Sequence, residues 1–117
     1  MTTSPDPLHM TAAEYVEAAR LAWSEDELKE WVLGEAQRGG WLFVHFRPAR
    51  TDRGWRTAME GDKGFPDLVL ARGGVVILAE LKSEKGRVSP DQEYWIKAAG
   101  AQVWRPSDWP KIQKVLA

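Results

Sequence analysis

Four residues in the second half of the chain have side chains that could bind a metal ion and activate water. They are Asp67, Glu80, Lys82 and Gln92. Two carboxylates can hold Mg²⁺ or Mn²⁺. Such an ion lowers the pKa of a bound water and neutralises charge that develops on a phosphate. A lysine beside it can orient or deprotonate that water, or bind the phosphate as a point charge. The set therefore indicates metal-assisted hydrolysis of a phosphate ester.

Two short apolar runs are predicted to position these residues. Residues 68–71 and 75–79 are apolar, and Arg72-Gly73-Gly74 separates them. This pattern predicts a buried β-hairpin. Both faces of the second run are apolar, so we expect its strand to be central in a sheet. Because side chains two apart on a strand share a face, Glu80 and Lys82 should lie side by side, near Asp67 on the neighbouring strand.

A structural interpretation of the same residues also exists. Glu80 and Lys82 could be a surface pair at a strand end, with Asp67 in a turn after a proline. The apolar run that leads directly into the charges argues against this, because buried charges are costly unless they are paired or used. His45, alone in an aromatic strand, is interpreted as a packed or hydrogen-bonded residue rather than a ligand.

The rest of the chain predicts helices and strands around this hairpin. Capping-box patterns begin at Thr11, Ser24 and Ser89. The predicted helices cover about residues 12–20, 25–38, 90–99 and 108–116, and predicted strands cover residues 41–46 and 101–104. Residues 47–64 show no apolar periodicity and predict a long loop, which in a small domain is usually functional. This order predicts an α/β fold with a mixed central sheet flanked by helices.

Composition limits the protein class. The chain has 117 residues, the size of one domain, and 44% of them are hydrophobic. It has no cysteine, which excludes disulfides, thiolate zinc sites and cysteine nucleophiles. No apolar run approaches the length of a membrane span, and the first residues lack the pattern of a signal peptide. We therefore expect a cytoplasmic protein without membrane contact.

The charge is close to neutral but unevenly distributed. A formal net charge of -1 argues against nucleic-acid binding by bulk charge alone. Basic residues nevertheless concentrate around the predicted site in the sequence. Their guanidinium and ammonium groups suit a phosphate backbone. The candidates are Arg47, Arg50, Arg53, Arg56, Lys63, Lys85 and Arg87. The alternative is a solvated loop balanced by neighbouring acids.

Three stretches together carry a resemblance to a known family. They are Gly64-Phe65-Pro66-Asp67-Leu68, Glu80-Leu81-Lys82 and Gly86-Arg87-Val88-Ser89-Pro90-Asp91-Gln92. In this order they resemble the VRR-NUC branch of the PD-(D/E)XK nuclease superfamily, and in particular its stand-alone, phage-type members. The similarity covers roughly residues 24–116 and implies a restriction-endonuclease-like fold, with residues 1–23 as an N-terminal extension and residues 24–117 as the nuclease domain.

The resemblance also implies roles for single residues. Asp67, Glu80 and the main-chain carbonyl of Leu81 would be metal ligands, and Lys82 would serve the attacking water. Gln92 would support the site from its helix. The same glutamine stands where a capping-box residue would bond back to the helix start, and both roles could hold.

The family further implies a glutamate on the first core helix that completes the metal shell. Glu25, Glu27 and Glu30 are candidates. Glu27 occupies the capping-box position, and all three could simply be favourable charges at a helix N-terminus. Glu25 follows the serine as in the family's usual Ser-Glu start, so we choose it.

The implied function is that of a Mg²⁺- or Mn²⁺-dependent DNA endonuclease. Stand-alone chains of this kind resemble structure-selective enzymes, so four-way (Holliday) junctions or flaps are the expected substrates. A homodimer would place two sites against paired strands of such a junction. The alternative is a catalytically silent module that binds DNA or docks in a replication or repair complex.

Overall fold

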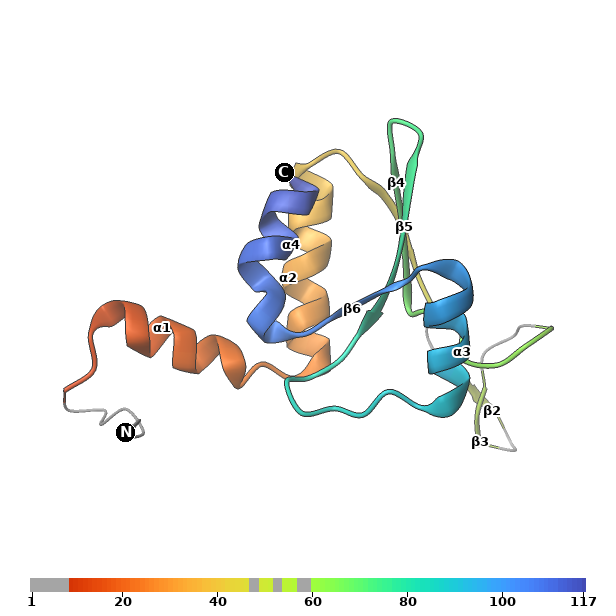
Figure 1. The fold of residues 1–117 in the computed structure, drawn as a ribbon, viewed down its shortest axis with the longest axis horizontal. Coiled ribbons are helices and arrows are strands. Elements are labelled where there is room, and N and C mark those ends of the chain that lie inside the picture. The colour runs from red at the N-terminus through yellow and green to blue at the C-terminus, as the bar shows by residue number, and fades with distance from the viewer. Residues whose placement is uncertain (1–8, 47–48, 52–53, 57–59) are drawn as a thin grey trace.

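The protein is built on a four-stranded mixed sheet with helices on both sides (Figure 1). A computed structural model describes residues 9–46, 49–51, 54–56 and 60–117, and for residues 49–51 and 54–56 it gives the backbone alone. The strand order is β1-β4-β5-β6. Their bounds are β1 (Leu42–His45), β4 (Leu68–Arg72), β5 (Val75–Leu81) and β6 (Gln102–Trp104). The predicted α/β class is confirmed.

The β4–β5 hairpin is the centre of this sheet. β1 and β5 both pair antiparallel with β4, and β6 pairs parallel with β5. Gly73 and Gly74 form the turn with φ angles of 56° and 81°, a left-handed conformation that glycine adopts without steric cost. β5 lies between β4 and β6, as the apolar sequence predicts.

The described part of the chain has four α-helices, where the sequence predicts them. They are α1 (Ala12–Leu21), α2 (Glu25–Arg38), α3 (Pro90–Ala99) and α4 (Trp109–Leu116), with a short 3₁₀ turn η1 (Pro106–Asp108) before α4. The capping boxes at Thr11, Ser24 and Ser89 all form. In Figure 1, α2 and α4 lie together on one side of the hairpin, α3 lies on the other, and α1 projects away. No helix in the described part of the chain is long and apolar enough to cross a membrane.

The core lies between the sheet and the α2–α4 pair. Leu28, Val32 and Ala36 form one buried stripe on α2, the spacing expected of an amphipathic helix. The hairpin contributes Leu68, Leu70, Ala79 and Leu81 to the same core, and α4 contributes Trp109, Ile112 and Leu116. This packing holds the ends of β4 and β5 against the N-terminal turns of α2.

Two expectations from the sequence need correction. The second apolar run is buried only in its last part: Val75 and Val76 are exposed, because β6 is short and pairs only with Ala79–Leu81. Residues 47–64 are not an unbroken loop, because β2 (Ala49–Thr51) and β3 (Gly54–Arg56) pair as a separate antiparallel hairpin. Strands of three residues are too short to show an alternating apolar pattern.

An arginine holds the end of α4 to the hairpin. The Arg72 guanidinium lies 4.4 Å from the centre of the Trp41 ring. Its Nη1 donates hydrogen bonds to the carbonyl oxygens of Gly39 at 2.8 Å, Leu116 at 3.4 Å and Ala117 at 3.1 Å. These contacts lie at the opposite end of β4 from Asp67.

Candidate active site

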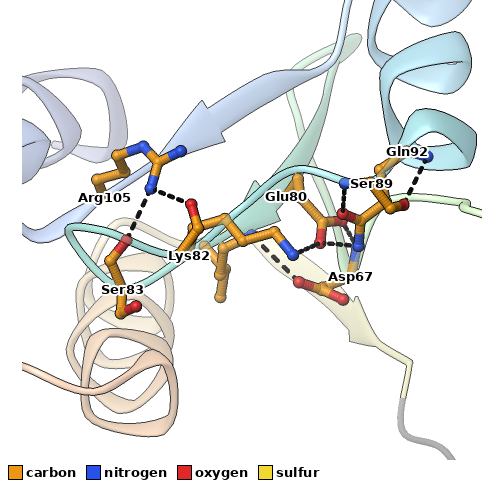
Figure 2. A network of polar contacts seen from close by, with 9 residues as sticks. Asp67, Glu80, Lys82, Ser83, Ser89, Gln92 and Arg105 are labelled. Atoms are coloured by element: carbon orange, nitrogen blue, oxygen red, sulfur yellow. Dashed lines mark hydrogen bonds and ion pairs between the residues drawn. The ribbon is translucent and has the colours of Figure 1, made fainter.

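Asp67 and Glu80 meet where β4 begins and β5 ends. In the hairpin register Leu68 pairs with Ala79, so Asp67 and Glu80 come next on each strand. The Asp67 amide donates to Glu80 Oε2 at 3.3 Å, and the Leu81 amide donates to Asp67 Oδ2 at 3.1 Å. Each carboxylate is therefore fixed by a backbone group of the other strand (Figure 2).

Glu80 is a buried carboxylate with two side-chain partners. The residue is 1% exposed. Its Oε1 accepts a hydrogen bond from Gln92 Nε2 at 2.7 Å and lies 3.5 Å from Lys82 Nζ. The Lys82 side chain is itself mostly buried, at 12% exposure. Figure 2 shows Lys82 and Gln92 approaching Glu80 from opposite sides. The expected Glu80–Lys82 pair is present, and it is not a surface pair.

The environment of Glu80 favours its protonated form. Burial is the largest cause, and together with the nearby Asp67 carboxylate it raises the pKa of Glu80 from 4.5 to about 7, although Lys82 acts in the opposite direction. Two carboxylates brought together at a buried strand end repel each other when both are ionised. A cation between them would relieve that repulsion.

The Gln92 side chain caps α3 and also contacts Glu80, while its role in the site stays a prediction. Its Oε1 accepts a hydrogen bond from the Ser89 amide at 2.9 Å, which completes the capping box of α3. Its Nε2 donates to Glu80. Because one amide side chain makes both contacts, the cap fixes the orientation of the group that bonds Glu80.

Gly64 allows the segment before Asp67 to approach α3. Its φ is +91°, and a Cβ atom there would lie 2.4 to 2.6 Å from backbone atoms of Asp91 and Gln92. No side chain fits at that distance. The glycine of the Gly-x-Pro-Asp pattern therefore lets the first turn of α3 pack against the strand that carries Asp67.

A pocket of about 390 Å³ opens beside these carboxylates. It is lined by Glu25, Asp26, Lys29, His45, Phe46, Asp67 and Leu81. Partial burial, followed by the charge of Asp67, raises the pKa of Glu25, and Lys82 lowers it. Glu25 is exposed at the pocket rim, so solvent screens part of these interactions. Glu25 thus shares one electrostatic site with Asp67 and Lys82.

The other two glutamate candidates have different partners. The Glu27 carboxylate accepts a hydrogen bond from the Ser24 amide at 3.2 Å and so completes the cap of α2. Glu30 pairs with Lys29 at 3.4 Å, and its side chain is 73% exposed. Neither lines the pocket. This placement supports the choice of Glu25, whose role stays a prediction.

The sequence matches the VRR-NUC domain family over residues 11–102. The chain belongs to the VRR-NUC family. The predicted family and the restriction-endonuclease-like α/β fold are confirmed, and the chain contains a nuclease-family domain. No curated protein and no solved structure shows significant similarity to it. The matched range contains Asp67, Glu80, Lys82 and Gln92. It also reaches into α1, while the division at residue 24 stays a prediction.

The structure describes the side chains of three of the seven residues that are predicted to contact DNA in this VRR-NUC domain. Lys63, Lys85 and Arg87 are exposed. Arg50 and Arg56 lie on the β2–β3 hairpin, for which the structure gives only the backbone. Arg47 and Arg53 lie outside the described residues. DNA contact by these seven residues stays a prediction.

Lys29 and His45 also line the pocket. Sequence reasoning did not predict Lys29 there, and the interpretation of His45 as a packed or hydrogen-bonded residue stays a prediction. Lys29 lies four residues after Glu25, which places both on one face of α2. That spacing is the signal that could have found it. His45 ends β1 and pairs with Leu68, next to Asp67. No comparable pattern marks a single histidine in an aromatic strand.

The donor groups of the VRR-NUC site suit a hard cation. Asp67 and Glu80 offer carboxylate oxygens, and Leu81 and Glu25 line the adjacent pocket. Oxygen donors of this kind favour Mg²⁺ or Mn²⁺ over metals that prefer sulfur or imidazole ligands. Within the described ranges, however, no three His, Asp or Glu side chains converge closely enough to hold an ion as they stand. Mg²⁺ is commonly held by one or two carboxylates with water completing its shell, so the Asp67–Glu80 pair does not need a third side chain to fit it.

Proposed function

We propose that this VRR-NUC chain is a Mg²⁺- or Mn²⁺-dependent DNA endonuclease that hydrolyses phosphodiester bonds. The observation that carries the proposal is the buried Glu80 carboxylate, held beside Asp67 and contacted by both Lys82 and Gln92. A buried carboxylate beside a half-buried one is costly for stability, even with a neighbouring lysine. Such an arrangement at the edge of an open pocket is expected where it has a chemical role.

Asp67, Glu80, the Leu81 carbonyl and Glu25 would hold the ion. When bound, it would lower the pKa of a water ligand and neutralise charge on the phosphate. Lys82, whose Nζ lies 3.5 Å from Glu80 Oε1, would orient the attacking water or bind the phosphate. Gln92 would keep the Glu80 carboxylate oriented through its bond to Oε1. The water oxygen would attack phosphorus in line as the bond to the leaving oxygen breaks.

DNA affinity would depend on local cations because the net charge is -1. The basic segment from Arg47 to Arg56 begins directly after His45 and Phe46, which line the pocket. Branched substrates, namely four-way junctions or flaps, a homodimeric assembly and a cytoplasmic location in a bacterial or phage-infected cell are proposed from the family resemblance.

The test is cleavage of labelled DNA by the intact chain. The panel contains a four-way junction, a flap, a splayed arm, a single strand and a plain duplex, each with Mg²⁺, Mn²⁺ or EDTA. We expect metal-dependent cutting that Lys82→Ala abolishes while DNA binding remains. Lys97→Ala is the matched control, because Lys97 is 75% exposed and pairs only with Glu93 on α3. Equal loss in both variants would contradict the role of Lys82.

One observation favours the second candidate, a silent DNA-binding or docking module. In the part of the chain that the structure covers, no ready three-ligand cation site exists. Metal-independent DNA binding without cleavage of any substrate, by a chain verified as folded, would support this candidate instead.

A further inference from the structure

The connection between β5 and α3 has almost no apolar side chain to anchor it. Residues 83–87 are Ser, Glu, Lys, Gly and Arg. Burial of apolar surface, the main force that fixes loops against a core, is therefore absent from this segment. Yet Lys82 and Gln92, at its two ends, both contact Glu80 Oε1. The geometry at Glu80 thus depends on a loop whose residues 83–87 are held by polar contacts, with the half-buried Val88 as the one apolar side chain of the connection.

Arg105 supplies most of those contacts. Its Nη1 donates hydrogen bonds to the carbonyl oxygens of Ser83 at 2.8 Å, Glu84 at 3.2 Å and Gly86 at 2.8 Å. The arginine follows β6 directly and is half-buried. Figure 2 shows its guanidinium extending to the loop on the side away from Asp67. One guanidinium group therefore binds three carbonyl oxygens of the segment that follows Lys82.

Neighbouring bonds hold both Arg105 and the loop in place. The Arg105 amide donates to Asp108 Oδ2 at 2.9 Å, which fixes the start of η1. The Ser107 amide donates to Glu84 Oε2 at 3.0 Å. Within the loop the Gly86 amide donates to the Ser83 carbonyl at 3.1 Å. The β6–η1 junction and the loop thus form one polar unit centred on the guanidinium.

We propose that Arg105 is a positioning residue of the nuclease site, acting through the loop that sets Lys82 and Gln92 about Glu80. This inference rests on the proposed function. Arg105 touches none of the carboxylates in the hydrogen bonds described, so its effect is on placement rather than on chemistry. Small misplacements of a catalytic group lower the rate of the chemical step more than they weaken substrate binding.

The test compares Arg105→Ala with the intact chain on the substrate that is cleaved best. We expect kcat to fall by roughly 100-fold while KM for DNA changes by no more than about 3-fold. Free guanidinium ion, at concentrations well below those that unfold the protein, should restore part of the lost rate by occupying the carbonyl cluster. Urea, which is planar but uncharged, should not.

Arg72→Ala is the matched control for a purely structural effect. Arg72 also donates to three backbone carbonyls, but at the far end of β4. We expect this variant to be less stable yet to keep its kcat at temperatures where it is folded. An equal fall of kcat in both variants, or an unchanged kcat in folded Arg105→Ala, would overturn the proposal.

A second readout does not depend on nuclease activity. Lys85 and Arg87 are exposed trypsin sites inside the loop, so their cleavage rate reports how firmly the loop is held. Arg105→Ala should be cut there faster, and guanidinium should slow the cut; unchanged trypsin cleavage would also overturn the proposal. If the intact chain cuts no DNA, the proposed function fails while this assay still decides whether Arg105 holds the loop. If Arg105→Ala does not fold, Arg105→Lys, which lacks the planar fork, takes its place with the same expected outcomes.

Discussion

At the scale of single residues, Glu80 shows how the fold meets the cost of a buried charge. Its two oxygens contact an amide side chain, a backbone amide and an ammonium group. These partners offset part of the desolvation cost, but Asp67 adds repulsion. The carboxylate pair therefore destabilises the folded state, and binding of a proton or a cation would relieve this destabilisation.

The first prediction concerns stability and pH in metal-free buffer. The pKa of Glu80 rises from 4.5 to about 7 on folding. Between these values the folded state binds more protons than the unfolded state, so the free energy of unfolding falls as pH rises through this window. The loss amounts to up to about 3 kcal/mol. Glu80→Gln cannot titrate there and should show a flatter profile, measured by urea unfolding between pH 4.5 and 7.5.

Mg²⁺ provides the complementary measurement. At pH 8, above the pKa of Glu80, Mg²⁺ should raise the Tm of the intact chain, because a ligand that binds only the folded state stabilises it. The shift should be small at pH 5.5 and absent in Glu80→Gln. A Tm shift that is equal in both proteins would place the ion elsewhere.

The second prediction separates the two contacts of Gln92. Gln92→Glu keeps an oxygen for the Ser89 amide but loses the donor to Glu80 and adds a negative charge. It should keep the cap of α3 and lose cleavage. Gln92→Ala loses both contacts and should also cost about 1 kcal/mol of stability from the cap. Thermal unfolding and cleavage rates of the two variants test this; full activity in Gln92→Glu would show that the donor is dispensable.

At the scale of elements, local signals predicted most of the fold. The capping boxes at Thr11, Ser24 and Ser89 each begin a helix in the structure, because they satisfy helix N-terminal amides from within four residues. The Gly73-Gly74 turn likewise defines its hairpin. Pairing between distant segments was harder to predict: β2 and β3 carry no periodicity, and the length of β6 decides how much of β5 is buried.

The site could be predicted in the same uneven way. Asp67, Glu80, Lys82 and Gln92 lie at hairpin ends and a helix start, so the strand register brings them together. Lys29 in the pocket and Arg105 under the loop come from elements that sequence patterns do not place relative to the hairpin. Their roles depend on tertiary packing, which a local pattern does not encode.

The third prediction concerns the packing of α3 on the segment before Asp67. Gly64→Ala adds a Cβ that would meet α3 backbone atoms at 2.4 to 2.6 Å and strains a φ of +91°. Gly74→Ala has a φ of +81° but open space around it, so it isolates the conformational cost of about 1–2 kcal/mol. We expect Gly64→Ala to be clearly less stable than Gly74→Ala and to lose cleavage, since Gln92 must shift. Equal unfolding free energies would contradict this contact.

At the scale of the whole molecule, the chain is more extended than its length requires. The radius of gyration is 16.5 Å, compared with about 13 Å for a compact domain of this size. In Figure 1, α1 projects from the body, and none of its residues is buried. α1 contacts the body at η1, and Trp23, just after α1, stacks on Trp31 at 5.2 Å and meets the edge of Trp109.

The fourth prediction tests the domain boundary at residue 24. Deletion of residues 1–21 keeps this tryptophan cluster and removes no buried side chain from the described part. The free energy of unfolding should fall by less than about 1 kcal/mol. Trp109→Ala, which opens the core, should cost roughly 3–5 kcal/mol. Urea unfolding compares the two, and a truncated chain that loses several kcal/mol would place α1 inside the folding unit.

The parallel pairing of β6 with β5 has a consequence for the order in which the protein assembles. The β4–β5 hairpin closes through a turn of two glycines, whereas β6 pairs with β5 only after residues 82–101, which include α3. Such closure is entropically costly and therefore late. The Lys82 amide bonds the Trp104 carbonyl, and Arg105 follows it. During folding, the hairpin that brings Asp67 and Glu80 together would thus form before β6 fixes Lys82 and Arg105. On heating, we expect cleavage to be lost at a lower temperature than the one at which amide exchange shows loss of the hairpin.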